Sequence, residues 1–242
     1  WDLPRPETAA QAVRRPSLTL ETRDGSVLAT YGDVVGATVH LSDLPPALPA
    51  AVVAIEDRRF WWHLGIDPIG IARAAWTNLR AGHTVQGGST LTQQVAKNLF
   101  LTNARTFRRK VQELLLTLWL ERHFTKRQIL EIWLNRIYLG GGAWGVDAAA
   151  QIYFGIPARR LNLWQSAMIA GLARAPSRFN PRSSPSAATA RTREVLAAMV
   201  ATGAITQAQV DAASAQIAFP PRGGGGGWFA DWIADYFSPT AV

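Results

Sequence analysis

AIEDRRFWWHLGID, at residues 54–67, is the stretch that predicts most about this chain. It places two adjacent carboxylates, Glu56 and Asp57, at the end of an apolar run and just before an aromatic cluster and a histidine. A carboxylate packed against apolar surface is costly to desolvate, so it either pairs with a cation or takes up a proton more readily. Arg58 and Arg59 are the nearest candidates for that cation. Such an acid suits general acid–base chemistry on a sugar, and the alternative is a helix end closed by a structural ion pair.

Length and composition indicate a folded, basic protein. The 242 residues are enough for one large domain or two small lobes, and 48% hydrophobic with only 17% charged residues excludes a disordered chain. The formal net charge of +8 predicts an anionic partner, which could be nucleic acid, anionic lipid or a phosphorylated substrate. The absence of cysteine excludes disulfides and zinc–thiolate sites.

Ten tryptophans indicate surfaces with one apolar and one wet side, which include membrane interfaces. No apolar run reaches the roughly 18–20 residues that cross a bilayer. No signal peptide is visible, and because the chain opens abruptly at Trp1 we expect it to come from a longer protein.

Turn and capping signals predict a mostly helical domain with short connections. Thr-x-x-Gln capping boxes are expected to start helices at Thr90, Thr125 and Thr206, and Asp67 before Pro68 is a predicted cap. Asp24-Gly25 between two β-prone runs predicts a hairpin over residues 17–31. Helices are expected at residues 49–57, 67–81, 90–100, 107–123, 125–139, 143–153, 161–174, 184–202 and 206–216. The helix at 107–123 is apolar nearly all round, which predicts a central, buried position.

Three regions follow from these signals. Residues 1–45 form a leader and the hairpin, residues 46–216 form the main domain, and residues 217–242 contain a glycine linker and an aromatic segment. That aromatic segment, 228–237, cannot bury its apolar face alone, so it docks on this domain or begins another.

A polar stripe is predicted on the helix that starts at residue 90. Gly87-Gly88 and the free N–H groups of that helix start form an anion cradle. Gln93 and Lys97 are four residues apart, as are Gln94 and Asn98, so these side chains share one face. Amides and an ammonium beside a helix N-terminus suit a pyrophosphate with a sugar attached, and the alternative is an ordinary solvated face.

A second charged group opens the helix at 107–123. Arg109 and Lys110 lie four and three residues before Glu113, so both cations can reach one carboxylate. Glu113 stands where the helix becomes strongly apolar, which predicts a partly buried, paired carboxylate. The group is either a structural ion pair or a basic clamp for phosphates that Glu113 positions.

Together these runs resemble a known enzyme family. The matching segments stand in the family's order over about residues 50–182. They are EDRRFWWHLGID, VQGGSTLTQQVAKNLFL, RRKVQELLLTLWLERHFTKRQILEIWLNRIYLGGGAWGVDAAAQIYFG and LARAPSRFNP. The chain is similar to the glycosyltransferase (transglycosylase) domain of class A penicillin-binding proteins and of monofunctional peptidoglycan glycosyltransferases.

The resemblance implies a mainly α, lysozyme-like, two-lobed helical domain, to which the sequence adds the short N-terminal β-hairpin. It implies that Glu56 and Glu113 are catalytic. Its motifs assign substrate binding to Asp57, Phe60, His63, Thr90, Gln94, Lys97, Arg109 and Lys110, and the polar stripe adds Gln93 and Asn98. No metal-ligand set is predicted.

The implied reaction is an inverting polymerisation of lipid II into glycan strands. The 4-hydroxyl of the acceptor lipid II attacks C1 of the lipid-linked donor chain, Glu56 takes the hydroxyl proton, and undecaprenyl pyrophosphate leaves. Lys97, Arg109 and Lys110 are the candidates to stabilise that leaving group. Glu113 either orients the two neighbouring cations or holds a divalent cation such as Mg or Mn. No other cofactor is expected.

The implied partners are lipid II, the growing lipid-linked glycan chain and the membrane surface. The family places the domain on the outer face of the bacterial cytoplasmic membrane, with an upstream anchor helix that this chain lacks, and moenomycin is the family's donor-site inhibitor. The 228–237 segment resembles the start of a linker to a C-terminal transpeptidase domain. Two alternatives are a lysozyme-like glycan hydrolase and a basic nucleic-acid-binding helical protein. The second would leave the two glutamates unexplained, so no nucleic-acid partner is predicted.

Overall fold

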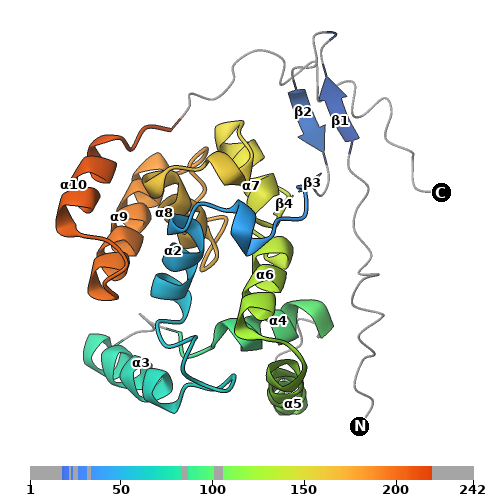
Figure 1. The fold of residues 1–242 in the computed structure, drawn as a ribbon, viewed down its shortest axis with the longest axis vertical. Helices are drawn as coiled ribbons and strands as arrows, with labels where there is room; N and C mark the ends of the chain where they lie inside the picture. The colour runs from blue at the N-terminus through green and yellow to red at the C-terminus, as the bar shows by residue number, and fades with distance from the viewer. Residues whose placement is uncertain are drawn as a thin grey trace.

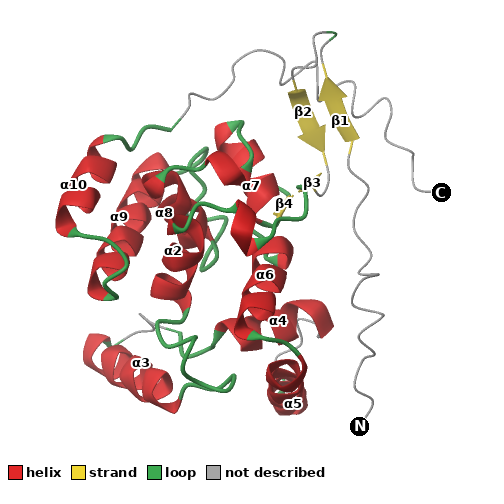
Figure 2. Cartoon of the chain, in the orientation of Figure 1, coloured by secondary structure: helices red, strands yellow, loops and turns green. Residues whose placement is uncertain are grey.

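The computed structural model describes residues 18–21, 23, 27–31, 34–82, 87–100 and 106–219, and they are mainly helical, as the sequence predicts (Figure 2). The helices are α2 (Ala47–Glu56), α3 (Pro68–Ala81), α4 (Leu91–Phe100), α5 (Phe107–His123), α6 (Lys126–Arg136), α7 (Val146–Phe154), α8 (Leu163–Leu172), α9 (Pro185–Ala201) and α10 (Gln207–Ala215). The shorter elements are the 3₁₀ helices η1 (Leu41–Asp43) and η2 (Ala158–Arg160) and the strands β1 (Leu18–Glu21), β2 (Val27–Tyr31), β3 (Val34–Val35) and β4 (Ala143–Trp144).

Two small sheets accompany the helices. β1 pairs antiparallel with β2, with Leu18 opposite Tyr31, which confirms the predicted hairpin. β3 pairs in parallel with β4, where the sequence predicts the start of a helix instead. Gly145 explains the difference, because its φ is +85° and a Cβ there would lie 2.9 Å from the carbonyl oxygen of Asn135. The chain therefore turns at Gly145 and α7 begins only after it.

The predicted helix starts are largely confirmed. Three Thr-x-x-Gln capping boxes are present, with reciprocal side-chain to backbone hydrogen bonds. They join Thr90 to Gln93, Thr125 to Gln128 and Thr206 to Gln209. Asp67 is the exception, since it precedes α3 without making a side-chain cap, and its carboxylate lies 3.5 Å from Nε of Arg59.

Helix ends differ more from the prediction. α3 ends at Ala81, as predicted, and Gly82 after it adopts a left-handed conformation. α6 stops at Arg136 rather than at residue 139, because Ile137 is extended and Tyr138 bridges to Trp144.

The helices form two groups (Figure 1). α2 packs on α8 and α9, and Leu48, Val52, Ile169 and Leu196 are completely buried in that larger group. α4 packs on both α5 and α6. In Figure 1, α3 and α5 lie at one end of the molecule and α7 to α10 lie toward the other, which agrees with the predicted two-lobed arrangement.

The predicted central position of α5 is wrong. Only Glu113, Leu116, Thr117 and Leu120 of this helix are buried, and Phe107 is 86% exposed. Further leucines of α5 are also 36–46% exposed. Periodicity detects an apolar surface, but it does not distinguish a neighbouring helix from another apolar environment. None of the helices in the described ranges has the length and hydropathy needed to cross a bilayer.

Several predictions fall outside the described residues. These are the leader at 1–16, the loop residues 83–86, most of the polar stretch 102–106, the glycine linker and the aromatic segment 228–237. The three-region division of the chain stays a prediction.

Candidate active site

Glu56 is the last residue of α2, where the backbone leaves the helix at Asp57. Nε2 of Gln94, on α4, donates a hydrogen bond of 2.8 Å to Oε2 of Glu56. Burial raises the pKa of the Glu56 carboxyl, and the Gln94 hydrogen bond and the positive charges of Arg191 and Arg174 oppose that rise. Glu56 is therefore a carboxylate that takes up a proton more readily than an exposed glutamate, as its sequence context predicts.

Gln94 is itself held from the other side. Nε1–H of Trp133, on α6, donates to Oε1 of Gln94 at 2.9 Å. Trp133 is 1% exposed and is the largest of the fully buried side chains. The side chain that contacts Glu56 therefore has a buried anchor on a third helix.

Asp57 turns away from its neighbour Glu56 into the protein. Both of its carboxylate oxygens lie 3.0 Å from Nε2 of His63, and Oδ2 also accepts from the backbone N–H of Leu91 at 3.0 Å. The Gly65 N–H donates to Nδ1 of His63 at 3.1 Å, so the ring proton sits on Nε2. Asp57 thus fixes the start of α4 rather than facing the solvent.

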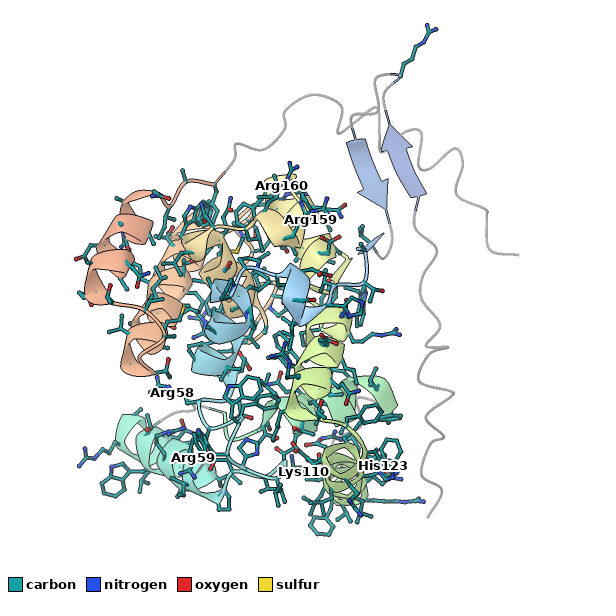
Figure 3. The ribbon with its side chains drawn as sticks, in the orientation of Figure 1. Arg58, Arg59, Lys110, His123, Arg159 and Arg160 are labelled. Atoms are coloured by element: carbon teal, nitrogen blue, oxygen red, sulfur yellow. The ribbon has the colours of Figure 1, made fainter. Side chains whose placement is uncertain are left out.

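The two candidate cations, Arg58 and Arg59, have other contacts than the two acids. Nε of Arg58 donates to the Ala54 carbonyl oxygen at 3.3 Å, and Arg59 is the residue that pairs with Asp67. Figure 3 shows Arg58 between the ends of α9 and α3 and Arg59 beside α3. Asp57 pairs with His63, six residues along the chain, and with the N-terminus of α4. The two arginines do not reach it because the turn after α2 carries them outward.

The predicted anion cradle at the start of α4 is occupied by the protein's own Asp57. That carboxylate receives the Leu91 N–H, and Thr90 Oγ1 donates to the Gly65 carbonyl oxygen at 2.6 Å. The predicted single polar stripe is also divided. Gln93 is 6% exposed and caps the helix, Gln94 faces Glu56, and only the two residues one turn further along, Lys97 and Asn98, are exposed.

Glu113 is paired as predicted. It is 3% exposed, Nη1 of Arg109 lies 2.9 Å from its Oε2, and Nζ of Lys110 contacts its Oε1. The side chain of Arg109 is 17% exposed and that of Lys110 is 52% exposed. In the view of Figure 3 Lys110 lies on the side of α5 toward α3. A buried anion thus holds two cations in place, and about half of the Lys110 side chain stays exposed.

The predicted site residues therefore fall into two sets. Those with accessible surface are Glu56, Gln94, Lys97, Asn98, Arg109 and Lys110. Those that are buried behind them are Asp57, Phe60, His63, Thr90, Gln93 and Glu113. Phe60 has no exposed surface and its ring packs edge-on against His63. The buried set shapes the turn after α2 and the starts of α4 and α5, which carry the accessible set.

One supporting network was not predicted. Glu121 on α5 accepts hydrogen bonds from Thr92 on α4 and from Lys126 on α6, the latter at 2.7 Å. Nζ of Lys126 also lies 4.6 Å from the centre of the Phe60 ring. The network joins three helices and the turn after α2. Glu121 and Lys126 are five residues apart, but Thr92 and Phe60 are distant in the chain, so no local sequence signal could have revealed the whole network.

A metal site is not apparent among the described residues, where no group of three or more histidine, aspartate or glutamate side chains converges. Both oxygens of Glu113 are engaged by Arg109 and Lys110. The carboxylate already has the partners that its burial requires.

Comparison with known proteins identifies the family. The family model described as Transglycosylase matches residues 24–200. The chain belongs to the transglycosylase family. The predictions of the family and of a glycosyltransferase enzyme are confirmed.

Curated relatives include penicillin-binding protein 1A of Aquifex aeolicus, 49% identical over 189 residues, and of Escherichia coli, 47% identical over 194 residues. These matches cover 78% and 80% of this chain but 26% and 23% of the relatives, so the chain spans about a quarter of their length. A crystal structure of penicillin-binding protein 1A from Haemophilus influenzae matches with a TM-score of 0.54 at 23% identity. That match covers 93% of this chain and 24% of the solved one, and it supports the fold.

Proposed function

We propose that this transglycosylase domain polymerises lipid II into glycan strands with Glu56 as the general base. The observation that carries the proposal is the state of Glu56, a partly buried carboxylate with a raised pKa and one amide donor. A base with a raised pKa is better matched to a neutral-pH proton transfer than an exposed glutamate. The acceptor 4-hydroxyl loses its proton to Glu56 as its oxygen forms the new bond to C1 of the donor.

The leaving undecaprenyl pyrophosphate needs positive charge. Lys110 and Arg109 supply it at the start of α5, and Lys97 adds an exposed ammonium on α4. Because both oxygens of Glu113 are engaged by the two cations of α5, its pairing favours the orienting role over metal binding. Its negative charge is thereby neutralised near the anionic leaving group.

The membrane is the expected location because the substrate is lipid-linked. Large apolar side chains are exposed on α3, α5 and the turn between α2 and α3, and they form what we call the apolar end surface. It comprises Trp62, Leu64, Ile69, Trp76, Leu79 and Phe107, each more than 50% exposed. Tryptophan and leucine at one end of a basic domain suit contact with an anionic membrane. We propose that this surface rests on the outer face of the cytoplasmic membrane.

The names and lengths of the relatives also suggest a second domain beside this one. Because penicillin-binding proteins 1A are about four times longer than the matched region, we propose that this domain works beside a C-terminal transpeptidase domain.

Glu56→Gln tests the assignment with labelled lipid II. We expect loss of glycan polymerisation by at least about 100-fold, because a positioned base contributes 10²–10⁴-fold. Asp211→Asn is the matched control, since it removes an exposed carboxylate on α10 and should leave the rate unchanged. Near-normal polymer formation by Glu56→Gln would remove Glu56 from the mechanism. Release of fragments from purified sacculi by the unaltered chain would instead favour a hydrolase.

A further inference from the structure

A buried indole controls the side chain that contacts Glu56. Trp133 on α6 donates to Oε1 of Gln94 on α4 at 2.9 Å, and Nε2 of Gln94 donates to Oε2 of Glu56 on α2 at 2.8 Å. The link therefore runs across three helices that are distant in sequence. Trp133 itself has no place in the reaction described above.

The direction of this link is fixed by chemistry. An indole N–H can only donate a hydrogen bond, so Gln94 must present its carbonyl oxygen to Trp133. The amide then has only its NH₂ group to offer to Glu56. If the amide rotated by half a turn, the buried indole N–H would face the NH₂ group and lose its partner, which costs about 1–3 kcal/mol.

We propose that Trp133 is a positioning residue that keeps Gln94 a hydrogen-bond donor and so holds Glu56 ready to accept a proton. An ionised carboxylate can only accept, so it matches the NH₂ group that Trp133 imposes. A protonated Glu56 could donate its O–H to a rotated Gln94, but Trp133 opposes that rotation. The indole thus disfavours the protonated form without touching the carboxylate. The inference rests on the proposed role of Glu56 as the base.

Other groups around Glu56 set the background for this effect. Arg191 on α9 and Arg174 after α8 favour the ionised form, whereas burial and the adjacent Asp57 favour the protonated form. Gln94 is the hydrogen-bonding group that opposes burial. Loss of its fixed orientation would leave burial less opposed, so the pKa of Glu56 should rise when Trp133 loses its N–H.

Trp133→Phe removes the donor and keeps an aromatic ring. We expect the acidic limb of the pH–rate profile for lipid II polymerisation to move up by about 0.5–1 pH unit, which corresponds to one ordinary hydrogen bond. Trp164→Phe is the matched control, because Trp164 is a buried indole that packs edge-on against Phe154 and Phe219. It should lose comparable stability and leave the acidic limb in place.

A double variant tests whether Trp133 acts through Gln94. Gln94→Met removes the amide, so adding Trp133→Phe to it should cause no further movement of the acidic limb. A movement that persists in the Gln94→Met background would overturn the proposal, as would an unmoved limb in Trp133→Phe alone.

Direct titration separates this inference from the proposed function. Carbon-13 NMR of labelled glutamate side chains, with Glu56→Gln to assign the signal, reads the pKa of Glu56 without any turnover. A higher pKa in Trp133→Phe supports the link even if Glu56→Gln proves active, and an unchanged pKa refutes the link even if Glu56 is the base.

A measurement on the unaltered chain covers the case in which Trp133→Phe does not fold. One indole N–H resonance should move with pH at the titration midpoint of Glu56, and that movement should vanish in Glu56→Gln. If no indole resonance follows Glu56, Trp133 does not sense its protonation and the proposal fails.

Discussion

Replacing Asp57 by asparagine should destabilise the fold although it changes one oxygen into one nitrogen. The carboxylate of Asp57 is almost fully buried and accepts from two donors, the His63 ring and the Leu91 backbone. Asparagine retains one accepting oxygen, and because both carboxylate oxygens of Asp57 lie 3.0 Å from Nε2 of His63, its NH₂ group must face the His63 N–H in either orientation. The His63 ring cannot resolve the conflict by moving its proton, because Nδ1 already accepts from the Gly65 N–H.

The size of the loss follows from two contributions. The asparagine NH₂ group is then a buried donor without an acceptor, which costs about 1–3 kcal/mol. Removing the negative charge from the N-terminus of α4 costs roughly 0.3–1 kcal/mol more. Together they predict a loss of about 1–4 kcal/mol, which is a fall in Tm of roughly 3–16 °C for a domain of this size.

Thermal and urea unfolding at pH 7 measure this loss, followed by circular dichroism. Asp211→Asn again serves as the control, because Asp211 is exposed on α10 and accepts a hydrogen bond from Gln207 on the same helix. It should change stability by less than about 0.5 kcal/mol. If Asp57→Asn behaved like this control, the buried pairing of Asp57 with His63 and α4 would not stabilise the protein as we argue.

Three further outcomes are expected. Glu56→Gln should stabilise the fold at pH 7 and not below pH 4.5. The pKa of Glu56 is raised in the folded chain, so ionising this carboxylate destabilises the fold only when the pH rises above the ordinary glutamate pKa. Equal stability of the variant and the unaltered chain at both pH values would contradict this. Lys110→Ala should reduce use of the lipid II donor more than of the acceptor, measured by varying each separately, whereas Arg122→Ala on the same helix should affect neither. Replacing Trp62 and Leu64 together by serine should weaken sedimentation with anionic vesicles by roughly tenfold or more, because two large exposed apolar side chains each contribute about 1 kcal/mol on partial burial. Unchanged sedimentation would show that the membrane contacts another surface.

Local signals predicted the secondary structure well. A Thr-x-x-Gln capping box depends on residues three apart, and all three predicted boxes are present. The Arg109, Lys110 and Glu113 group was predicted correctly for the same reason, because one helical turn is enough to bring its members together.

Interactions across the chain could not be predicted from spacing. Asp57 found its partner in His63 and in a helix start 34 residues away, while Arg58 and Arg59, adjacent in sequence, lie elsewhere. The apolar pattern of α5 likewise predicted the helix correctly but its burial wrongly. An apolar residue in a sequence indicates a surface that avoids water. Whether another helix or a membrane covers that surface depends on the assembled fold.

α4 shows both the local signals and the long-range contacts. Its sequence suggested a surface for binding phosphate, yet the N–H of its first residue, Leu91, is bound by Asp57, and its fourth residue, Gln94, holds Glu56. The adjacent acids therefore contact the same helix from different sides, one at its N-terminus and one along its face. A short rigid helix that is fixed by one carboxylate can hold the amide that orients the other. This arrangement explains why a base at the end of α2 would need an aspartate beside it that faces away from the accessible side chains of the site.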